Sequence, residues 1–239
     1  MNDVLITGAA RGLGLALART FSEAGWRVFA CARNASDRDR LQALREQRPK
    51  LVVPIRFDVT SDHDRYRARQ LVEHETDSLD VLLNNAGINA GTSGNPQAHV
   101  SLGSLDGDEM AEMFRVNSIA PLLVVQTFRE LLVRSDYPRV VNVSSDSGSI
   151  TRKETPGNYS YAASKAALNM ITRALANELR SDRIVVTAVD PGHLRTDIGG
   201  PTAPDDPDDA ADELYELIED LSPGETGEFL ARTGEKLAW

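Results

Sequence analysis

The stretch that decides the fold is DVLITGAARGLGLALARTF, residues 3–21, at the amino end of the sequence. Residues 4–6 form an apolar run that is too short for a helix and is typical of a buried parallel strand. Glycines follow at positions 8, 12 and 14, and apolar residues then recur with helical spacing as far as Gly25. With a further strand expected at 27–32, the order of elements predicts a βαβ unit.

The three glycines predict a phosphate-binding turn. Gly8 permits a tight turn, Gly12 lets the backbone approach a pyrophosphate, and Gly14 lets helix and strand pack closely. The helix that follows offers free N–H groups and a partial positive charge. The spacing G-x-x-x-G-x-G differs from the common G-x-G-x-x-G, and no Gly-Lys-Ser/Thr follows, which argues against a Walker-type site. A loop that only turns the chain is the alternative, and the flanking strand and helix argue against it.

Length and composition narrow the class of protein. The chain has 239 residues with regularly recurring apolar runs and no linker-like stretch, so we expect a single domain over residues 1–239. A net charge of −10 argues against nucleic-acid binding through a basic face. The one cysteine, Cys31, is expected to be a buried strand residue rather than a nucleophile and fits a cytoplasmic location. We expect no signal peptide and no membrane span.

Strand and helix patterns alternate along the chain. Strands are predicted at 3–7, 27–32, 52–57, 80–84, 139–144 and 184–190, and helices at 12–24, 37–47, 62–76, 106–134 and 159–181, with a further helix near 207–221 and a strand near 228–232. This alternation predicts an α/β fold, a Rossmann-type doubly wound parallel sheet flanked by helices on both faces.

Two stretches, 88–104 and 199–209, are rich in turn-forming residues and follow predicted strands. They are expected at the carboxyl edge of the sheet, where open α/β folds bind ligands. The second contains an acidic cluster, Asp205, Asp206, Asp208 and Asp209. We interpret this cluster as the start of a helix, where carboxylates are favourable, with a cation site as the alternative. No metal site is expected.

Tyr161 and Lys165 lie four residues apart on a predicted helix and therefore share one face. Free tyrosine has a pKa near 10, and a nearby ammonium is expected to lower it. Tyr161 would then serve as a proton donor to a carbonyl or as an acceptor from an alcohol. The alternative is a surface tyrosine beside a solvated lysine. Two strands that end in polar residues at the same edge, 82–87 and 140–145, favour the first interpretation.

Together these motifs resemble the short-chain dehydrogenase/reductase family over essentially the whole length. The motifs that carry the resemblance are Thr7-Gly8-x-x-x-Gly12-x-Gly14, Asn84-Asn85-Ala86-Gly87, Asn117, Ser145-x-x-Gly148, Tyr161-x-x-x-Lys165 and Pro191-Gly192. The segment Ser164–Met170 and the carboxyl-terminal residues from Thr226 are similar to the C-factor and sniffer-like carbonyl reductase branch.

The resemblance implies a role for each catalytic residue. Tyr161 is the general acid/base, Ser145 polarises the substrate oxygen, Lys165 holds the nicotinamide ribose and tunes Tyr161, and Asn117 supports a water. It also implies that Asp58 binds the adenine amino group beside Val59, and that Thr196 contacts the nicotinamide amide or the phosphates. The remaining implied cofactor-binding residues are Thr7, Gly8, Arg11, Gly12, Leu13, Gly14, Arg33, Asn85, Ala86, Gly87, Pro191 and Gly192.

Two competing assignments are decided by register. Ser145 is preferred over Ser144 because only Ser145 fits the family pattern Ser-x-x-Gly with Gly148. Tyr159 lacks a lysine four positions later, since residue 163 is Ala. The spacing from Ser145 to Tyr161 is a few residues longer than is usual in the family. We expect the extra length to reshape the substrate mouth, which the loops near 88–104, 148–158 and 193–210 should form.

The second strand predicts the cofactor. It ends Ala32-Arg33, where an NAD-specific site needs an acidic residue, and Arg11 lies in the glycine turn. Two arginines can bind a 2′-phosphate, so NADP(H) is expected to be preferred over NAD(H). Solvated surface arginines are the alternative. Asp37 and Asp39 are expected to point away in the next helix.

The sequence therefore predicts an NADP(H)-dependent oxidoreductase that reduces a ketone or aldehyde to an alcohol, or the reverse. A cofactor-binding signalling or regulatory protein with little turnover is the alternative. The expected partner is a small carbonyl or alcohol substrate, with no nucleic acid and no membrane. The resemblance also implies a homodimer or homotetramer, which in the family often forms through the helices at 106–134 and 159–181, with a monomer as the alternative.

Overall fold

The computed structural model describes residues 1–89 and 100–239, except for the side chains of residues 35–38. Much of the predicted loop 88–104 therefore lies outside the described residues. The strands are β1 (Asp3–Ile6), β2 (Arg27–Ala32), β3 (Val52–Arg56), β4 (Val81–Asn84), β5 (Arg139–Val143), β6 (Val185–Asp190) and β7 (Phe229–Ala231). They form one parallel sheet in the order β3-β2-β1-β4-β5-β6-β7, which confirms the predicted fold class.

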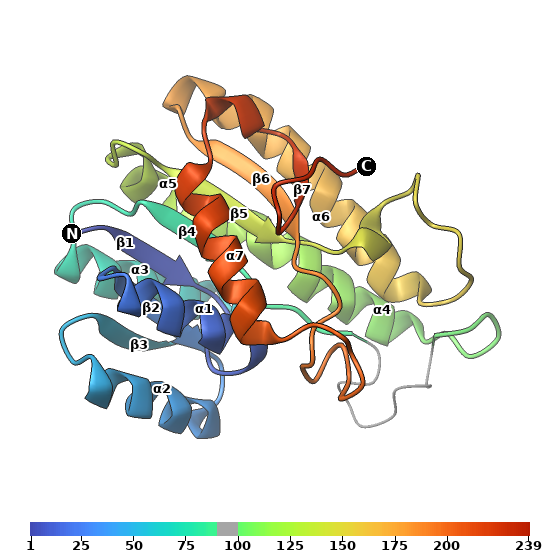
Figure 1. The fold of residues 1–239 in the computed structure, drawn as a ribbon, viewed down its shortest axis with the longest axis horizontal. Coiled ribbons are helices and arrows are strands. Elements are labelled where there is room, and N and C mark those ends of the chain that lie inside the picture. The colour runs from blue at the N-terminus through green and yellow to red at the C-terminus, as the bar shows by residue number, and fades with distance from the viewer. Residues whose placement is uncertain (90–99) are drawn as a thin grey trace.

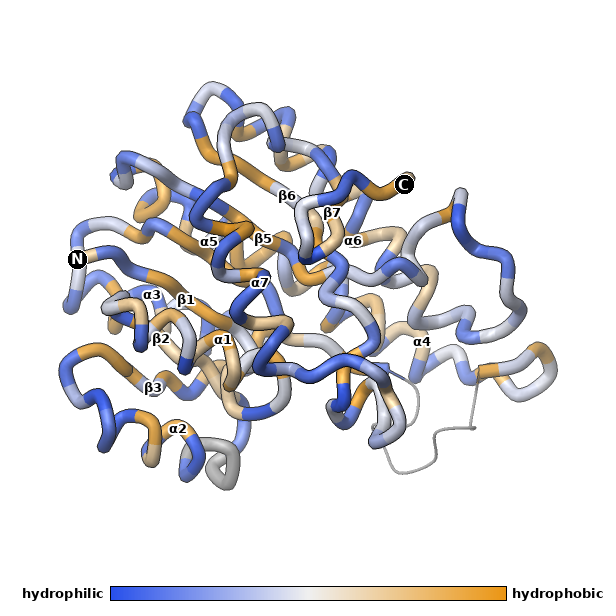
Figure 2. The backbone as a smooth tube through the Cα atoms, in the orientation of Figure 1, coloured by the Kyte–Doolittle hydropathy of each residue, from blue (hydrophilic) through white to orange (hydrophobic). Residues whose placement is uncertain are grey.

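Helices cover both faces of this sheet (Figure 1). One face packs against α1 (Gly12–Glu23), α2 (Ala35–Gln47) and α7 (Pro207–Asp220), and the other packs against α3 (Asp62–Glu75), α5 (Ala120–Val133) and α6 (Tyr159–Glu178). The strands supply both cores by alternation: Val4 and Ile6 join the first cluster, whereas Leu5 joins the second. Because both faces are covered, the strands are apolar runs, visible as orange segments in the centre of Figure 2.

The long helix predicted at 106–134 is interrupted. The structure has α4 (Gly107–Phe114), a π-helical turn (Arg115–Ile119) and then α5. A π turn inserts extra backbone into a helix and often marks a functional position. Asn117 lies within it, so the interruption falls on a predicted site residue. The other predicted elements agree within a few residues, and the helix predicted at 159–181 ends in a 3-10 turn, Leu179–Asp182.

The segment Gly107–Val133 is long and apolar enough to cross a membrane by length and composition alone. In this structure its apolar side chains pack in the protein core. Val124, Phe128 and Leu131 are fully buried in the second core cluster, against the sheet. The core helix of a folded domain satisfies the same criterion as a membrane span, so the segment is weak evidence for membrane insertion.

The acidic cluster is placed at the start of α7. The Asp206 carboxylate caps the helix by accepting from the Asp208 N–H at 2.9 Å, and Asp209 follows in the first turn. Asp205 instead pairs with Arg232 at 3.0 Å. Among the described residues, no group of three or more His, Cys, Asp or Glu side chains is placed to hold a metal ion. Cys31 is fully buried, and this burial raises the pKa of its thiol.

Candidate active site

A cavity of about 810 Å³ opens at the carboxyl edge of the sheet. The turns after β1, β2, β3, β4, β5 and β6 and the start of α6 line it. The predicted site residues that line the cavity are Gly8, Arg11, Gly12, Leu13, Gly14, Arg33, Asp58, Val59, Asn85, Ala86, Gly87, Ser145, Tyr161, Lys165, Pro191, Gly192 and Thr196. Thr7 and Asn117 do not line it. The fold thus gathers residues from 8 to 196 around one space.

The glycine turn is built as a phosphate cradle. Gly8 and Gly12 have φ of +67° and +50°, a left-handed backbone that side chains disfavour. A Cβ on Gly14 would lie 2.2 Å from the Gly8 carbonyl oxygen, so only glycine permits this packing of α1. Arg11, at the N-cap of α1, makes no side-chain capping bond. No side chain therefore caps the first N–H groups of α1, and these groups can donate hydrogen bonds to a phosphate.

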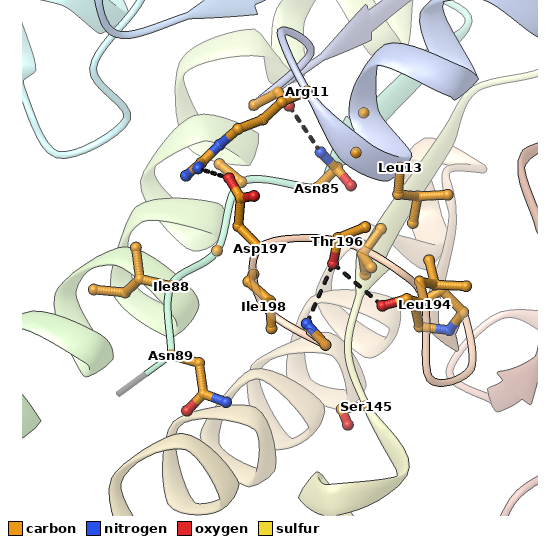
Figure 3. A pocket seen from close by; sticks show the side chains of 18 of the residues that line it. Arg11, Leu13, Asn85, Ile88, Asn89, Ser145, Leu194, Thr196, Asp197 and Ile198 are labelled. Carbon is orange, nitrogen blue, oxygen red and sulfur yellow. Dashed lines mark hydrogen bonds and ion pairs between the residues drawn. The ribbon is translucent and has the colours of Figure 1, made fainter. Parts of the chain in front are cut away.

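The loop after β6 closes over this turn. A Cβ on Gly12 would lie 2.9 Å from the Thr196 methyl group, which shows how closely the two segments approach. The guanidinium of Arg11 also forms an ion pair with Asp197 from the same loop (Figure 3). Both side chains of the pair are exposed. The loop after β6 and the glycine turn are thus joined beside the cavity by one charged contact.

Thr7 supports the cavity from behind. Its hydroxyl is buried, donates to the Leu83 carbonyl at 3.3 Å, and accepts from the N–H groups of Asn85 and Ala86, both at 3.0 Å. The Asn85 amide donates in return to the carbonyl oxygens of Thr7 and Gly8, at 2.9 and 3.2 Å. These bonds tie the end of β4 to the end of β1, which fixes the floor beneath the expected adenosine side.

Exposed arginines gather where β2 ends. Arg33 lines the cavity together with Ala32, and so does Arg40 from α2, which sequence reasoning missed. The sequence could have indicated Arg40, because α2 begins directly after β2, the strand whose end sets the cofactor preference. Asp39 is exposed and is not among the lining residues, whereas the side chain of Asp37 lies outside the described residues.

The turn after β3 lies at the same end of the cavity. Asp58 and Val59 line it with Phe57. The Asp58 carboxylate accepts from the N–H and the hydroxyl of Thr60, at 2.9 and 2.7 Å. The carboxylate is therefore held in place by its own turn.

The two serines after β5 are in different environments. The Ser144 hydroxyl is buried and donates to the Asn169 side-chain oxygen at 2.6 Å. Ser145 lies at the cavity (Figure 3), where its hydroxyl accepts from the Ser147 N–H at 3.2 Å and donates to the Asp146 carboxylate at 3.3 Å. It is also close enough to the Tyr161 hydroxyl to lower the pKa of that group. Ser145 is thus the serine whose side chain reaches the tyrosine.

Tyr161 and Lys165 share one face of α6, as the spacing predicts. The Lys165 Nζ atom lies 5.6 Å from the centre of the Tyr161 ring and donates to the Val143 carbonyl at 2.7 Å. Lys165 is only 4 % exposed. Tyr159, in contrast, is 41 % exposed and lies outside the cavity lining. The structure therefore separates the two tyrosines in the way the register argument requires.

The pKa of Tyr161 differs from the expectation. Burial is the largest cause and raises it to about 12, the carboxylates of Asp190 and Asp146 raise it further, and the Ser145 hydroxyl lowers it. Burial also lowers the pKa of Lys165 to about 8, against the opposing charge of Asp190. Desolvation of the phenolate therefore dominates, and the expected lowering by Lys165 is not seen. Tyr161 is a protonated phenol at neutral pH.

Asn117 lies beneath the cavity. Its side-chain oxygen accepts from the Ile88 N–H at 2.9 Å, and its amide donates to the Ile88 carbonyl at 2.8 Å and to Ser164 at 3.0 Å. A Cβ on Gly87 would lie 3.5 Å from the Asn117 oxygen and 3.7 Å from the Lys165 Nζ atom. Asn117 therefore joins the segment after β4 to α6 beside Lys165. Its implied water relay stays a prediction.

The polar lining residues that sequence reasoning missed include Asp146, Asp190 and His193. Asp190 ends β6 and accepts from the N–H groups of Asp146 and Gly192, at 3.2 and 3.4 Å. Burial raises the pKa of Asp190. A signal was present, since Asp190 directly precedes the Pro191-Gly192 motif and Asp146 directly follows Ser145.

The expected substrate loops contribute unequally. Residues 193–199 line the cavity, whereas the stretch 148–158 contributes Asn158. Within that stretch, Ser149 donates to the Ala238 carbonyl at 2.7 Å and the Thr151 N–H donates to Trp239 at 3.0 Å. Trp239 stacks on Phe229, with ring centres 5.5 Å apart. The extra length after Ser145 is thus held by the carboxyl-terminal residues.

A dinucleotide-type glycine turn and a Ser/Tyr/Lys group at one cavity define an oxidoreductase of the Rossmann class. The short chain dehydrogenase family model matches residues 2–207, and the chain belongs to that family. It is therefore a short-chain dehydrogenase/reductase, an NAD(P)-dependent oxidoreductase.

Individual relatives agree with this assignment. The chain is 34 % identical to the C-signal of Myxococcus xanthus over 164 residues, 69 % of this chain and 95 % of that protein. The structure of NADPH-bound carbonyl reductase from chicken fatty liver superposes with a TM-score of 0.91 at 30 % identity, covering 100 % of this chain and 99 % of the other. The carbonyl reductase Sniffer of D. melanogaster gives 0.93 at 27 % identity, covering all of both chains.

Proposed function

We propose that this protein uses NADP(H) to reduce a ketone or aldehyde to an alcohol. The observation that carries the proposal is that Ser145 and Tyr161 line the same cavity as the glycine turn, with the Ser145 hydroxyl close enough to Tyr161 to lower its pKa. Carbonyl reduction requires a proton donor beside a nicotinamide, and this arrangement supplies the donor.

The chain's residues fit a dinucleotide. The glycine turn and the start of α1 would hold the pyrophosphate, and Asp58 with Val59 would hold the adenine. Lys165, beside Gly87, would hold the ribose next to the nicotinamide. When bound, the cofactor supplies the hydride.

Proton transfer is the part performed by the protein. The Tyr161 hydroxyl is protonated at neutral pH, so it can donate its proton to a carbonyl oxygen during hydride transfer. The Ser145 hydroxyl would position and polarise that oxygen beside Tyr161.

The preference for NADP(H) is supported by charge. Arg33 and Arg40 lie exposed at the end of β2, where Ala32 stands in place of the acidic residue that binds a 2′-hydroxyl. A 2′-phosphate adds negative charge at this place, and exposed guanidinium groups favour it. The similar carbonyl reductase from chicken fatty liver was solved with NADPH.

A direct test measures oxidation of NADPH with a panel of aldehydes, ketones and quinones. We expect turnover with at least one carbonyl class, and loss of that turnover in Tyr161→Phe. Absence of turnover across the panel, with the cofactor still bound, would instead favour the second candidate. That candidate is a cofactor-binding signalling protein, and the similarity to the C-signal of Myxococcus xanthus supports it.

Self-association is a further part of the proposal. Ile119 and Leu122 are exposed around the start of α5, and Met170 on α6 is 71 % exposed. Contiguous exposed apolar patches mark interaction sites, and we infer that these side chains contribute to such a patch. We therefore expect a homodimer or homotetramer, which light scattering coupled to size exclusion would detect. A monomeric mass at micromolar concentration would contradict it.

A further inference from the structure

The two ends of the cavity carry opposite charge. At the glycine turn and β2, the lining residues include Arg11, Arg33 and Arg40, which outnumber the carboxylates Asp58 and Asp197, and Asp197 pairs with Arg11. At the end that holds Ser145 and Tyr161, the charged lining residues include the carboxylates Asp146 and Asp190. The arginine end suits phosphates, whereas the acidic end is the place left for a substrate.

The acidic charge acts at the position of the reaction. Asp146 and Asp190 both raise the pKa of the Tyr161 hydroxyl, and Asp146 raises that of Asp190. Asp190 is partly buried and fixed by two backbone N–H groups, at 3.2 and 3.4 Å. Asp146 is exposed, so its carboxylate lies at the open side, where an entering molecule meets it.

The cations nearby do not cancel this charge for an entering molecule. Lys165 is buried and its Nζ atom is bonded to the Val143 carbonyl. Arg195 also lines the cavity, but its guanidinium binds Asp206 at 2.8 Å. Arg152 lowers the pKa of Asp190 through its charge, yet it is not among the lining residues.

The imidazole of His193 is also at this end. Its Nε2 atom lies 2.8 Å from the Gly199 carbonyl oxygen, so that nitrogen carries a proton towards the backbone. The charge that faces an entering substrate is therefore set mainly by Asp146.

We propose that the substrate end of this cavity selects against carboxylate-bearing carbonyl compounds and favours neutral or cationic ones, with Asp146 as the specificity-determining residue. This rests on the proposed function, because it assigns the substrate to the Ser145 end. The effect is modest in size because Asp146 is exposed. For an exposed charge pair we expect a discrimination of about three- to fivefold from this residue, weakened by salt.

Binding of two matched probes tests the proposal without turnover. The probes are 4-carboxybenzyl alcohol and 4-(trimethylammonio)benzyl alcohol, which share the para-substituted benzyl alcohol core and carry opposite charge, and the Asp146→Asn comparison separates charge from shape. Each is titrated by ligand-observed NMR into protein that is saturated with reduced cofactor, a mixture that cannot react. We expect tighter binding of the cation, and in Asp146→Asn a ratio of dissociation constants reduced by about three- to fivefold.

Glu216→Gln is the matched control. Glu216 is exposed on α7, outside the cavity lining, and its replacement changes the net charge by the same amount. We expect the wild-type ratio in this variant. Equal binding of the two probes, tighter binding of the carboxylate, no saturable binding of either, or the same ratio in Asp146→Asn would overturn the proposal.

Failure of the proposed function has a different signature. If the panel of carbonyl compounds is not reduced while the probe ratio depends on Asp146, catalysis is refuted and the charge selection stands. If the corresponding aldehydes are reduced with equal kcat/KM and the probes bind equally, catalysis stands and the charge selection is refuted.

Discussion

The ammonium of Lys165 donates a 2.7 Å hydrogen bond to the carbonyl oxygen of Val143, the last residue of β5. This bond ties α6, which carries Tyr161, to the strand that leads into Ser145. It also holds the ammonium in a buried position, where desolvation lowers its pKa to about 8. The buried position that brings Lys165 to the site therefore destabilises the charged form of its ammonium group.

The first prediction concerns stability against pH. Below about pH 8 Lys165 is charged in both states, and the cost of burying the charge is fully present. Between pH 8 and 10 the unfolded state binds more protons, so the free energy of unfolding from this group rises with pH. Over this pH range, the free energy of unfolding of wild type should rise by about 2–3 kcal/mol relative to that of Lys165→Met, as measured by urea denaturation. Parallel curves for the two proteins would contradict it.

The second prediction concerns Tyr161. Tyr161→Phe removes the proton donor but keeps the ring, so kcat should fall by ~10²–10⁴-fold, with NADPH affinity nearly unchanged. Steady-state kinetics and cofactor fluorescence measure the two quantities. Tyr159→Phe is the matched control and should retain activity, because that side chain lies outside the cavity. Near wild-type turnover in Tyr161→Phe would show that the assignment is wrong.

The third prediction separates the adjacent serines. Ser145→Ala should lower kcat by ~10²-fold or more, since it removes a donor at the developing oxyanion. Ser144→Ala should mainly lower the free energy of unfolding, by about 1–3 kcal/mol, because the buried Asn169 oxygen loses its partner. Kinetics and urea denaturation on both variants provide the comparison. Larger loss of turnover at Ser144 would reverse the assignment.

The fourth prediction concerns cofactor choice. NADPH should bind about tenfold or more tightly than NADH, and Arg33→Ala should weaken NADPH binding while leaving NADH binding unchanged. The preference should shrink as salt is added. Arg45→Ala, an exposed arginine of α2 outside the cavity lining, is the control. Fluorescence titration with both cofactors decides, and equal affinities in wild type would refute the preference.

The fifth prediction follows from the pair between Arg11 and Asp197. In Asp197→Asn the guanidinium is released for a 2′-phosphate, so NADPH should bind up to about fivefold more tightly, as expected for an exposed ion pair. Asp208→Asn, which breaks the exposed pair with Arg19 at 2.9 Å, is the control. Unchanged or weaker NADPH binding in Asp197→Asn would mean that the pair holds the loop in its binding position.

Local patterns in the sequence predict the fold and most of the cavity. An apolar run, a glycine turn and a helical period each depend on neighbouring residues, so β1 and α1 follow from residues 3–21 alone. The spacing of Tyr161 and Lys165 likewise fixes their common face, because both lie on one helix. The register from Gly148 selected Ser145, and the structure places that side chain, rather than that of Ser144, beside Tyr161.

What only the tertiary structure decided depends on contacts between distant segments. The pKa of Tyr161 was expected to fall through Lys165, but burial and the carboxylate of Asp190, from β6, raise it. The pairing of Arg11 with Asp197 joins residues far apart in the chain. Desolvation and charge–charge distance are properties of the packed molecule, so the sequence determined which groups are present, and the fold determined the charge that each one meets.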